Sequence, residues 1–188
     1  MTVLEIDRKL ARELVPHELI PHRPTETAAD EATALGLPAD EVAKTVVLVT
    51  STGYVRAVLP ASERLDLHKA RRLLGDNKAR LATEAELTAA YPTFELGAVP
   101  PFAGPVGDRV IVDKRLAFCD SVVFEAGSHS ESVRLKTTDL LVVAEAEIAD
   151  LCADWRTVPV RHPLWTHTAA RLRRRGGPRR QSPRPSRS

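Results

Sequence analysis

Helical and extended patterns of hydrophobic residues alternate along the chain. Apolar residues recur over 4–15 with the period of an amphipathic helix, and Pro16 ends this helix. The run 46–49 is instead almost continuously apolar and β-branched, which is typical of a strand buried on both faces. Thr52-Gly53 then forms a turn, and 54–59 returns as the second strand of a hairpin.

Capping and turn residues place the other elements. Thr27 is a candidate N-cap of an Ala-rich helix that Gly36 ends, and Thr83 with Glu86 forms a capping box for a helix reaching about Tyr91. Further helices are predicted from the residues after 65–68 to Leu74, over 114–118, and over 140–142 after a Thr137-Thr138-Asp139 cap. Further strands are predicted over 18–20, 79–82, 109–112, 121–125, 132–135 and 147–149. Hairpins mixed with crossovers favour an α/β fold with a mixed sheet over a doubly wound parallel sheet.

The longest irregular stretch, 92–108, is rich in glycine and proline. A loop of this length in a compact domain is usually functional or disordered. Its apolar residues Phe94, Leu96, Val99 and Phe102 argue against disorder. We therefore expect an ordered, functional loop.

Composition places the chain among soluble globular proteins. Its 188 residues suit one domain with extensions, and 43% hydrophobic and 28% charged residues are ordinary values. We see no membrane-span or signal-peptide pattern, so a cytoplasmic protein without a membrane partner is expected. Cys119 and Cys152 are far apart and lack metal-ligand spacing, so two free thiols are expected and neither a disulfide nor a metal site.

The net charge of +2 conceals an acidic domain and a basic tail. Ten of the 27 basic residues and one of the 25 acidic residues follow Cys152, so residues 1–152 carry about −7. The Arg-rich segment 171–188 cannot form a core and is expected to be disordered, whereas Trp155 and Trp165 are apolar enough to dock. The tail is either an inert extension or a source of phosphate contacts, and deleting 169–188 would distinguish these by the salt dependence of nucleic-acid binding.

Several common catalytic motifs are absent. There is no Walker loop, GxGxxG, GxSxG or zinc-type His/Glu pair. Polar residues gather instead in three places, each of which could be only a cap, a turn or a lysine covering a strand end. The three groups are His22 with Thr25 and Thr27, Lys44 with Thr45, and Gly127, Ser128, His129, Ser130 and Ser132.

Three motifs in register resemble the YbaK / prolyl-tRNA synthetase-associated editing domain family. They are the strand-opening Lys-Thr of AKTVVL, the Gly-x-x-x-Pro-Phe loop of GAVPPF, and the glycine-containing break of EAGSHSESVRLKTTDLL. The resemblance covers roughly 17–151. It implies a mixed, partly curled β-sheet surrounded by helices, with a cleft over Lys44. The chain then divides into an N-terminal helix (1–16), an editing domain (17–152) and a basic tail (153–188).

The same resemblance implies which residues act. Lys44 corresponds to the family's principal functional side chain and is the predicted catalytic residue. The predicted substrate-binding residues are His22, Thr27, Thr45, Gly97, Pro101, Phe102, Gly127, Ser128 and His129.

Hydrolysis of an aminoacyl ester suits this set of residues. The ester is already activated, so positioning and charge stabilisation matter more than a strong nucleophile. The Lys44 ammonium can hold a phosphate or carbonyl oxygen, and loop N–H groups can stabilise the developing negative charge. Water attacks, either activated by the substrate's ribose hydroxyl or by a group that the sequence does not identify. No cofactor is required.

Three functions fit these residues. The first is a free-standing deacylase that acts in trans on mischarged aminoacyl-tRNA, with an aminoacyl-tRNA synthetase as a further candidate partner. The alternative is a non-catalytic tRNA- or RNA-binding or regulatory protein on the same fold, and the third is an interaction module. Intact Lys44 and the glycine loop favour the first. The amino acid removed is not specified; alanine and cysteine on proline tRNA are the family's best-known cases.

Overall fold

The structure is a computed structural model that describes residues 3–102 and 107–154. The chain divides into two compact units, Met1–Val158 and Pro159–Ser188. The second unit lies entirely outside the described residues. The predictions for Trp155, Trp165 and the segment 171–188 therefore lie outside the described residues too.

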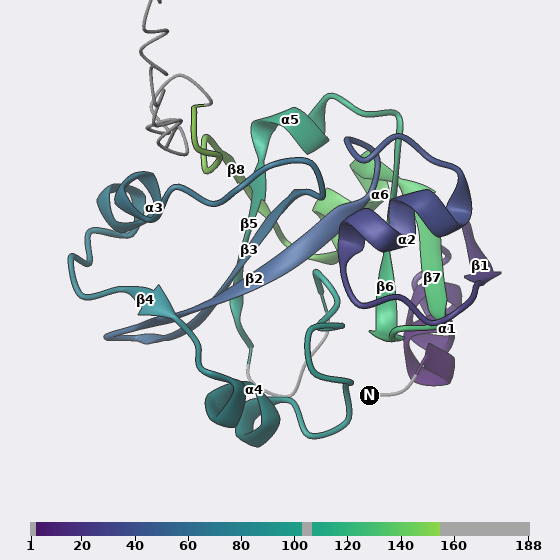
Figure 1. The fold of residues 1–188 in the computed structure, drawn as a ribbon, viewed down its shortest axis with the longest axis horizontal. Helices are drawn as coiled ribbons and strands as arrows, with labels where there is room; N and C mark the ends of the chain where they lie inside the picture. The colour runs from purple at the N-terminus through teal and green to yellow at the C-terminus, as the bar shows by residue number, and fades with distance from the viewer. Residues whose placement is uncertain (1–2, 103–106, 155–188) are drawn as a thin grey trace, which may run out of the picture. The chain divides into compact units, whose positions relative to one another are not determined.

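The described strands form two sheets that lie beside one another (Figure 1). One sheet is mixed and has the order β4 (Arg80–Leu81), β2 (Ala43–Thr50), β3 (Gly53–Pro60), β5 (Arg109–Asp113), β8 (Glu147–Ala149). The other is antiparallel, with the order β1 (His17–Pro21), β7 (Glu131–Lys136), β6 (Ser121–Ser128). A single bridge between Val42 and Val123 links them. The α/β class with mixed strand directions is confirmed, and the strands are divided between two sheets.

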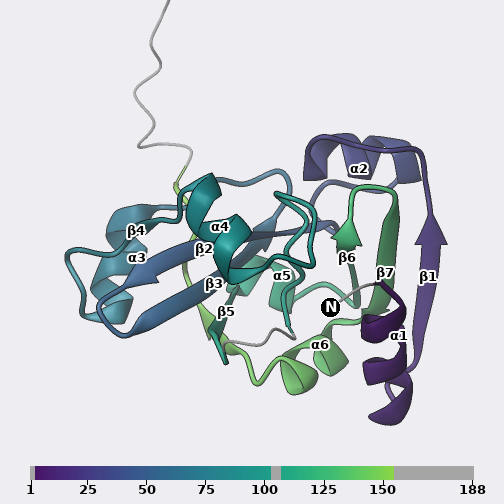
Figure 2. The same ribbon diagram turned by 90° about the horizontal axis from the view of Figure 1, so that it is seen from below.

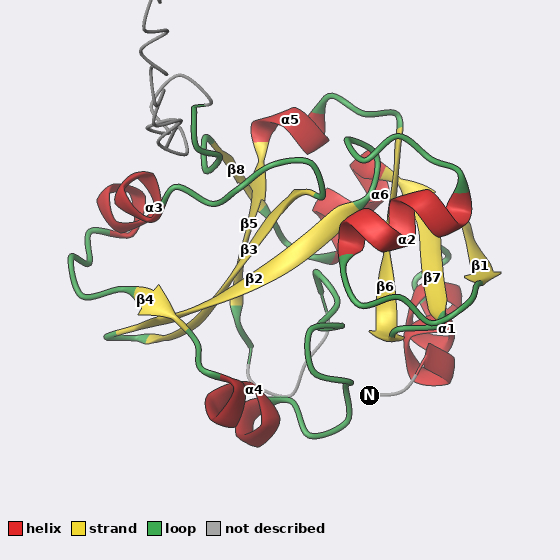
Figure 3. Ribbon diagram, in the orientation of Figure 1, coloured by secondary structure: helices red, strands yellow, loops and turns green. Residues whose placement is uncertain are grey.

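Among the described residues, six helices surround the two sheets, and Figure 3 draws them as red ribbons. They are α1 (Val3–Arg12), α2 (Ala28–Leu35), α3 (Leu67–Leu74), α4 (Glu84–Ala90), α5 (Lys114–Ala117) and α6 (Thr137–Val143). In the part of the chain that the structure describes, no helix combines the length and apolar character needed to cross a membrane.

Most predicted helix ends are confirmed, and two are wrong. Thr27 caps α2, which ends at Gly36, and Thr83 forms the predicted capping box of α4. Helix α1 ends at Arg12, before 15, because the backbone at Leu14 turns to a φ of +57°. Helix α6 starts behind Lys136 without a side-chain cap, because the Thr137 side chain is buried in the fold.

Alternate residues of β2 pack on opposite faces of its sheet. Val46 and Leu48 join a cluster with Leu59 and Ala70 beside α3. Val47 joins another cluster, under α4, with Tyr91 and Val99. Within 46–49, burial is complete only for Val47 and Leu48, so the expected burial of the whole run is only partly observed.

A buried arginine anchors the loop that follows α4. Arg56 on β3 donates to the carbonyls of Pro100 at 2.7 Å and Phe102 at 3.2 Å, and forms an ion pair with Asp108 at 2.8 Å. Its guanidinium lies 5.0 Å from the Tyr91 ring centroid, and the Tyr91 hydroxyl donates to Asp108 at 2.6 Å. We call these residues the Arg56 network. It holds the predicted functional loop against the sheet, because backbone carbonyls of the loop accept from a buried charge.

Candidate functional site

A cavity of about 360 Å³ lies where the two sheets meet. Its walls come from α2, the first half of β2, strand β6 and the loop after α4, which runs between α4 and β6 in both Figure 1 and Figure 2. The lining residues are Glu26, Thr27, Ala28, Glu31, Ala43, Lys44, Thr45, Val46, Gly97, Ala98, Val99, Phe124, Glu125 and His129. The α2, β2 and β6 walls therefore contribute both apolar and polar side chains, whereas the loop wall is made of Gly97, Ala98 and Val99.

Lys44 opens β2 at the edge of the cavity. Successive side chains of a strand point to opposite faces of the sheet. The Lys44 side chain therefore lies on the same face as Val46 and on the opposite face from Thr45. Its ammonium donates to the Ala61 carbonyl at 3.1 Å. Burial lowers the pKa of Lys44, and the Arg64 charge lowers it further. No ion pair of Lys44 occurs among the described residues, so its charge is available to an anionic or carbonyl oxygen.

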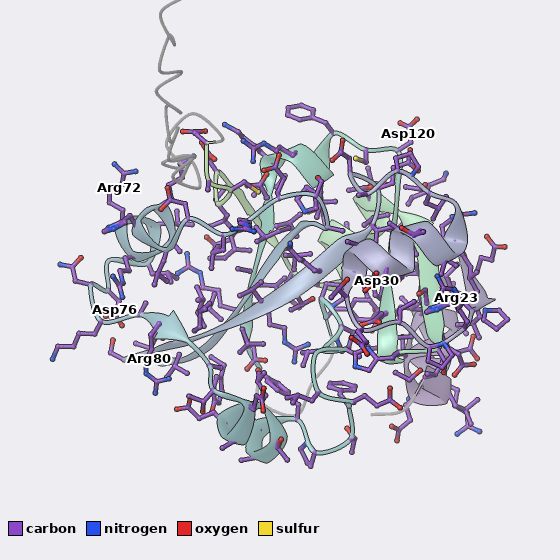
Figure 4. All side chains as sticks on the ribbon, in the orientation of Figure 1. Arg23, Asp30, Arg72, Asp76, Arg80 and Asp120 are labelled. Carbon is purple, nitrogen blue, oxygen red and sulfur yellow. The ribbon has the colours of Figure 1, made fainter. Side chains whose placement is uncertain are left out.

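Glu31 is the most deeply buried acid of the cavity. The neighbouring Asp30 is exposed on α2 (Figure 4), whereas Glu31 has no solvent exposure. Oε1 of Glu31 accepts from the Ser132 hydroxyl at 2.5 Å, while Oε2 is buried with no hydrogen-bond partner among the described residues. Burial raises the pKa of Glu31 to about 7, against the lowering effect of the Ser132 hydrogen bond.

His129 and Glu125 form a coupled pair beside Glu31. Nδ1 of His129 lies 3.0 Å from Oε1 of Glu125, and Nε2 donates to the Leu96 carbonyl at 2.9 Å. Burial raises the pKa of Glu125; it also opposes protonation of His129, but the bonds to Glu125 and Leu96 leave the pKa of His129 raised. The pair shares one proton, so its net charge is zero whichever partner holds it.

Gly97 lets the loop approach His129. Its φ is +99°, and a Cβ built there would lie 3.4 Å from Cε1 of His129. Glu95 tightens the same contact, because its N–H donates to the Gly127 carbonyl and its carboxylate accepts from the His129 N–H at 2.7 Å. The loop is therefore tied to the β6–β7 turn on one side and to the Arg56 network on the other.

Half of the predicted site residues line this cavity. Lys44, Thr27, Thr45, Gly97 and His129 come together there from four separate parts of the chain. Thr27 also serves as the N-cap of α2.

The other five predicted residues lie outside the cavity lining. Phe102 is in the core, edge-on to Phe124, and Pro101 is buried beside it. Gly127 and Ser128 lie within β6, where an irregularity between Glu125 and Ser128 interrupts the pairing; they were expected to break the strand. His22 lies behind the cavity, with Nε2 at 2.8 Å from the Ser132 hydroxyl.

The model of the aminoacyl-tRNA editing domain matches residues 22–142, which include all of the cavity lining. The chain belongs to the aminoacyl-tRNA editing domain family.

Individual relatives agree with this family. The editing domain is 33% identical over 98 residues to the multifunctional Ser/Thr-tRNA deacylase ProXp-y of Escherichia coli (strain K12), covering 52% of this chain and 58% of the relative. It is 35% identical over 126 residues to a proline–tRNA ligase of Shouchella clausii, covering 62% of this chain and 21% of the ligase. A crystal structure of a proposed trans-editing enzyme for prolyl-tRNA synthetase superimposes with a TM-score of 0.74 at 27% identity, covering 81% of this chain and 97% of the other.

Sequence reasoning missed all three acids that line the editing domain's cavity, Glu26, Glu31 and Glu125. Glu31 follows another acid in the predicted helix, and Glu125 lies in a predicted strand without any motif of its own. The only available signal for Glu125 was its spacing of four residues before His129. No group of three or more metal-ligating residues occurs in 3–102 or 107–154.

Proposed function

We propose that this protein is a deacylase that hydrolyses the ester bond of mischarged aminoacyl-tRNA and acts in trans. The observation that carries the proposal is the cavity edged by Lys44 in a chain of the editing family. A pure RNA-binding module needs neither such a cavity nor a half-buried lysine without a counter-ion at its edge. The E. coli relative's name describes a Ser/Thr-tRNA deacylase, which supports the same reaction class here.

The cavity favours a small amino acid. Its volume of about 360 Å³ is at the lower end of small-molecule sites, and it must also admit part of the terminal ribose. Val99 and Phe124 provide apolar contacts, while Thr45 supplies a hydroxyl. A large side chain would be excluded sterically, whereas discrimination among small ones would depend on polar contacts.

The reaction needs only water and charge stabilisation. Water attacks the ester carbonyl carbon, and the negative charge moves to the carbonyl oxygen. The intermediate then collapses, the bond to the ribose oxygen breaks, and that oxygen takes up the proton that water has lost. The Lys44 ammonium can stabilise an oxyanion or an adjacent phosphate once it leaves the Ala61 carbonyl. His129 positions the loop, because both of its ring nitrogens are already hydrogen-bonded.

A panel of tRNAs mischarged with alanine, serine, threonine and cysteine tests the proposal. Deacylation well above the spontaneous rate, lost in Lys44→Ala, would support it. A folded protein that binds tRNA but hydrolyses none of these esters would favour the non-catalytic RNA-binding alternative. Correctly charged Pro-tRNA is the control substrate.

A further inference from the structure

Glu31 is a buried acid without a compensating partner. Its side chain has no solvent exposure and lines the cavity, and its Oε2 atom has no hydrogen-bond partner among the described residues. Burying such a group is costly unless something donates to it. Asp108 also has one unpartnered oxygen, but its charge is neutralised by Arg56 at 2.8 Å. No cation forms an ion pair with Glu31 in the part of the chain that the structure describes.

The groups around Glu31 do not supply the missing charge. Glu125 and His129 form a net-neutral pair, and Ser132 is a neutral donor to the other carboxyl oxygen. The titratable or charged groups that face Glu31 or share its cavity are Glu26 before α2, Lys44 on β2, Glu125 on β6, His129 in the β6–β7 turn, and His22 through Ser132 on β7. Because Lys44 donates to Ala61, none of these provides a hydrogen bond to Oε2.

A ligand with an ammonium group would satisfy this site best. A charge-assisted N–H···O bond is roughly twice as strong as a neutral one, and it would also neutralise the buried carboxylate. Every aminoacyl ester carries an ammonium group on the carbon next to the ester carbonyl. We infer that Glu31 is the receptor for the α-ammonium group of the substrate, which positions the ester carbonyl within the cavity. This inference rests on the proposed function.

Two residues behind Glu31 position its carboxyl group. Nδ1 of His22 donates to the Arg23 carbonyl at 2.9 Å, while Nε2 lies 2.8 Å from the Ser132 hydroxyl. The Ser132 hydroxyl in turn lies 2.5 Å from Glu31. His22 thereby holds the Ser132 hydroxyl against Oε1 of Glu31, which leaves Oε2 to accept from the ligand ammonium. His22 and Ser132 are positioning residues, because neither lines the cavity.

The test uses a pair of stable analogues that differ in one group. The full-length protein is titrated by calorimetry with 3′-deoxy-3′-(L-alanylamino)adenosine and with its L-lactoyl counterpart, in which a hydroxyl replaces the ammonium group. The amide linkage prevents hydrolysis. We expect the wild-type protein to prefer the ammonium compound by about tenfold or more at pH 8, since hydrogen bonds to charged groups are the strong ones.

Variants assign this preference to Glu31. Glu31→Gln preserves shape and should bring the ratio of the two affinities close to one. Glu26→Gln is the matched control, because Glu26 lines the same cavity but is exposed, and it should keep the ratio. An unchanged ratio in folded Glu31→Gln, or no binding of either analogue to the wild type, would overturn the inference.

The pH dependence gives a second readout that needs no folding of a Glu31 variant. The ratio in the wild-type protein should fall as pH decreases and Glu31 becomes protonated. Ser132→Ala removes a bond that lowers the pKa of Glu31, so the midpoint of this fall should move to higher pH. A midpoint that does not move contradicts the positioning role of Ser132, and a ratio independent of pH contradicts the role of Glu31.

The proposed function can fail separately. If mischarged tRNAs are not hydrolysed but the analogue ratio depends on Glu31, the ammonium site stands and the deacylase proposal fails. If they are hydrolysed and the ratio does not depend on Glu31, only the ammonium site is refuted.

Discussion

Two regions of this fold bury charge in opposite ways. In the Arg56 network, the guanidinium meets a carboxylate, two carbonyls and an aromatic ring, so the buried charge is compensated within the protein. In the cavity, neither Glu31 nor Lys44 forms a hydrogen bond with an oppositely charged group among the described residues. The difference indicates that the first region supports structure, whereas the second retains binding capacity for a ligand.

Removing the charge of the Arg56 network should have the largest effect. Arg56→Met leaves Asp108 buried without its cation, and breaking a buried pair in this way costs about 3–5 kcal/mol of unfolding free energy. Denaturant unfolding measures this. Arg109→Met is the matched control, because the Arg109–Glu147 pair is exposed and should contribute about 0–1 kcal/mol. Equal losses in both variants would mean that the Arg56 network is no more structural than a surface pair.

Lys44→Ala should lower activity and leave stability almost unchanged, the reverse of the stability loss expected for Arg56→Met. Loss of one charge-stabilising donor typically lowers the rate by about 10²–10³, so kcat/KM for a mischarged tRNA should fall by at least ~100-fold while unfolding changes little. Single-turnover deacylation is the measurement, with exposed Lys78→Ala as the control. A folded Lys44→Ala protein with near-normal turnover would remove Lys44 from the mechanism.

Gly97→Val tests the loop that joins the two regions. Valine at a φ of +99° is strained by about 1–3 kcal/mol, and its side chain would press on the His129 ring. We expect turnover to fall by about tenfold, which corresponds to ~1.4 kcal/mol of lost transition-state stabilisation. Gly75→Val also introduces strain at positive φ, but into open space, so it should lower stability without affecting turnover. Similar turnover in the two variants would show that the contact with His129 is unimportant.

Glu31→Gln should change the stability of the ligand-free protein by less than Arg56→Met does, and this change should depend on pH. The pKa of Glu31 is raised from 4.5 to about 7, so the folded state binds a proton more tightly than the unfolded state. Wild-type stability therefore declines as pH rises from about 4.5 through 7, and this contribution is absent in Glu31→Gln. Between pH 5 and pH 8 the variant should gain about 1–3 kcal/mol relative to the wild type. Parallel stability curves would show that Glu31 is not buried as described.

Local signals predicted most elements of this fold. The β2–β3 hairpin follows from one apolar run, a Thr-Gly turn and a second run, and the ends of α2 follow from Thr27 and Gly36. The position of Lys44 at the start of β2 was also predictable. Each of these features depends on residues close together in the sequence.

Long-range packing decided what could not be predicted. Glu31 is buried because α2 packs against Val42 and Val123, and its carboxyl group accepts from Ser132, 101 positions later in the chain. Arg56 meets loop carbonyls 44 and 46 positions away. Phe102 is the last residue of the Gly-x-x-x-Pro-Phe motif. Its side chain lies in the core because Phe124 provides an edge-to-face partner there. No periodicity within a single element contains this information.

The narrow connection between the two sheets gives the protein a natural spectroscopic marker. At the Val42–Val123 bridge, the Val123 amide donates to the Glu41 carbonyl at 2.9 Å, and the cavity is lined by residues of both sheets. The chemical shift and exchange rate of this one amide proton depend on the separation of the sheets. It can therefore report, without a label in the cavity, whether an occupied cavity draws the two halves of the domain together.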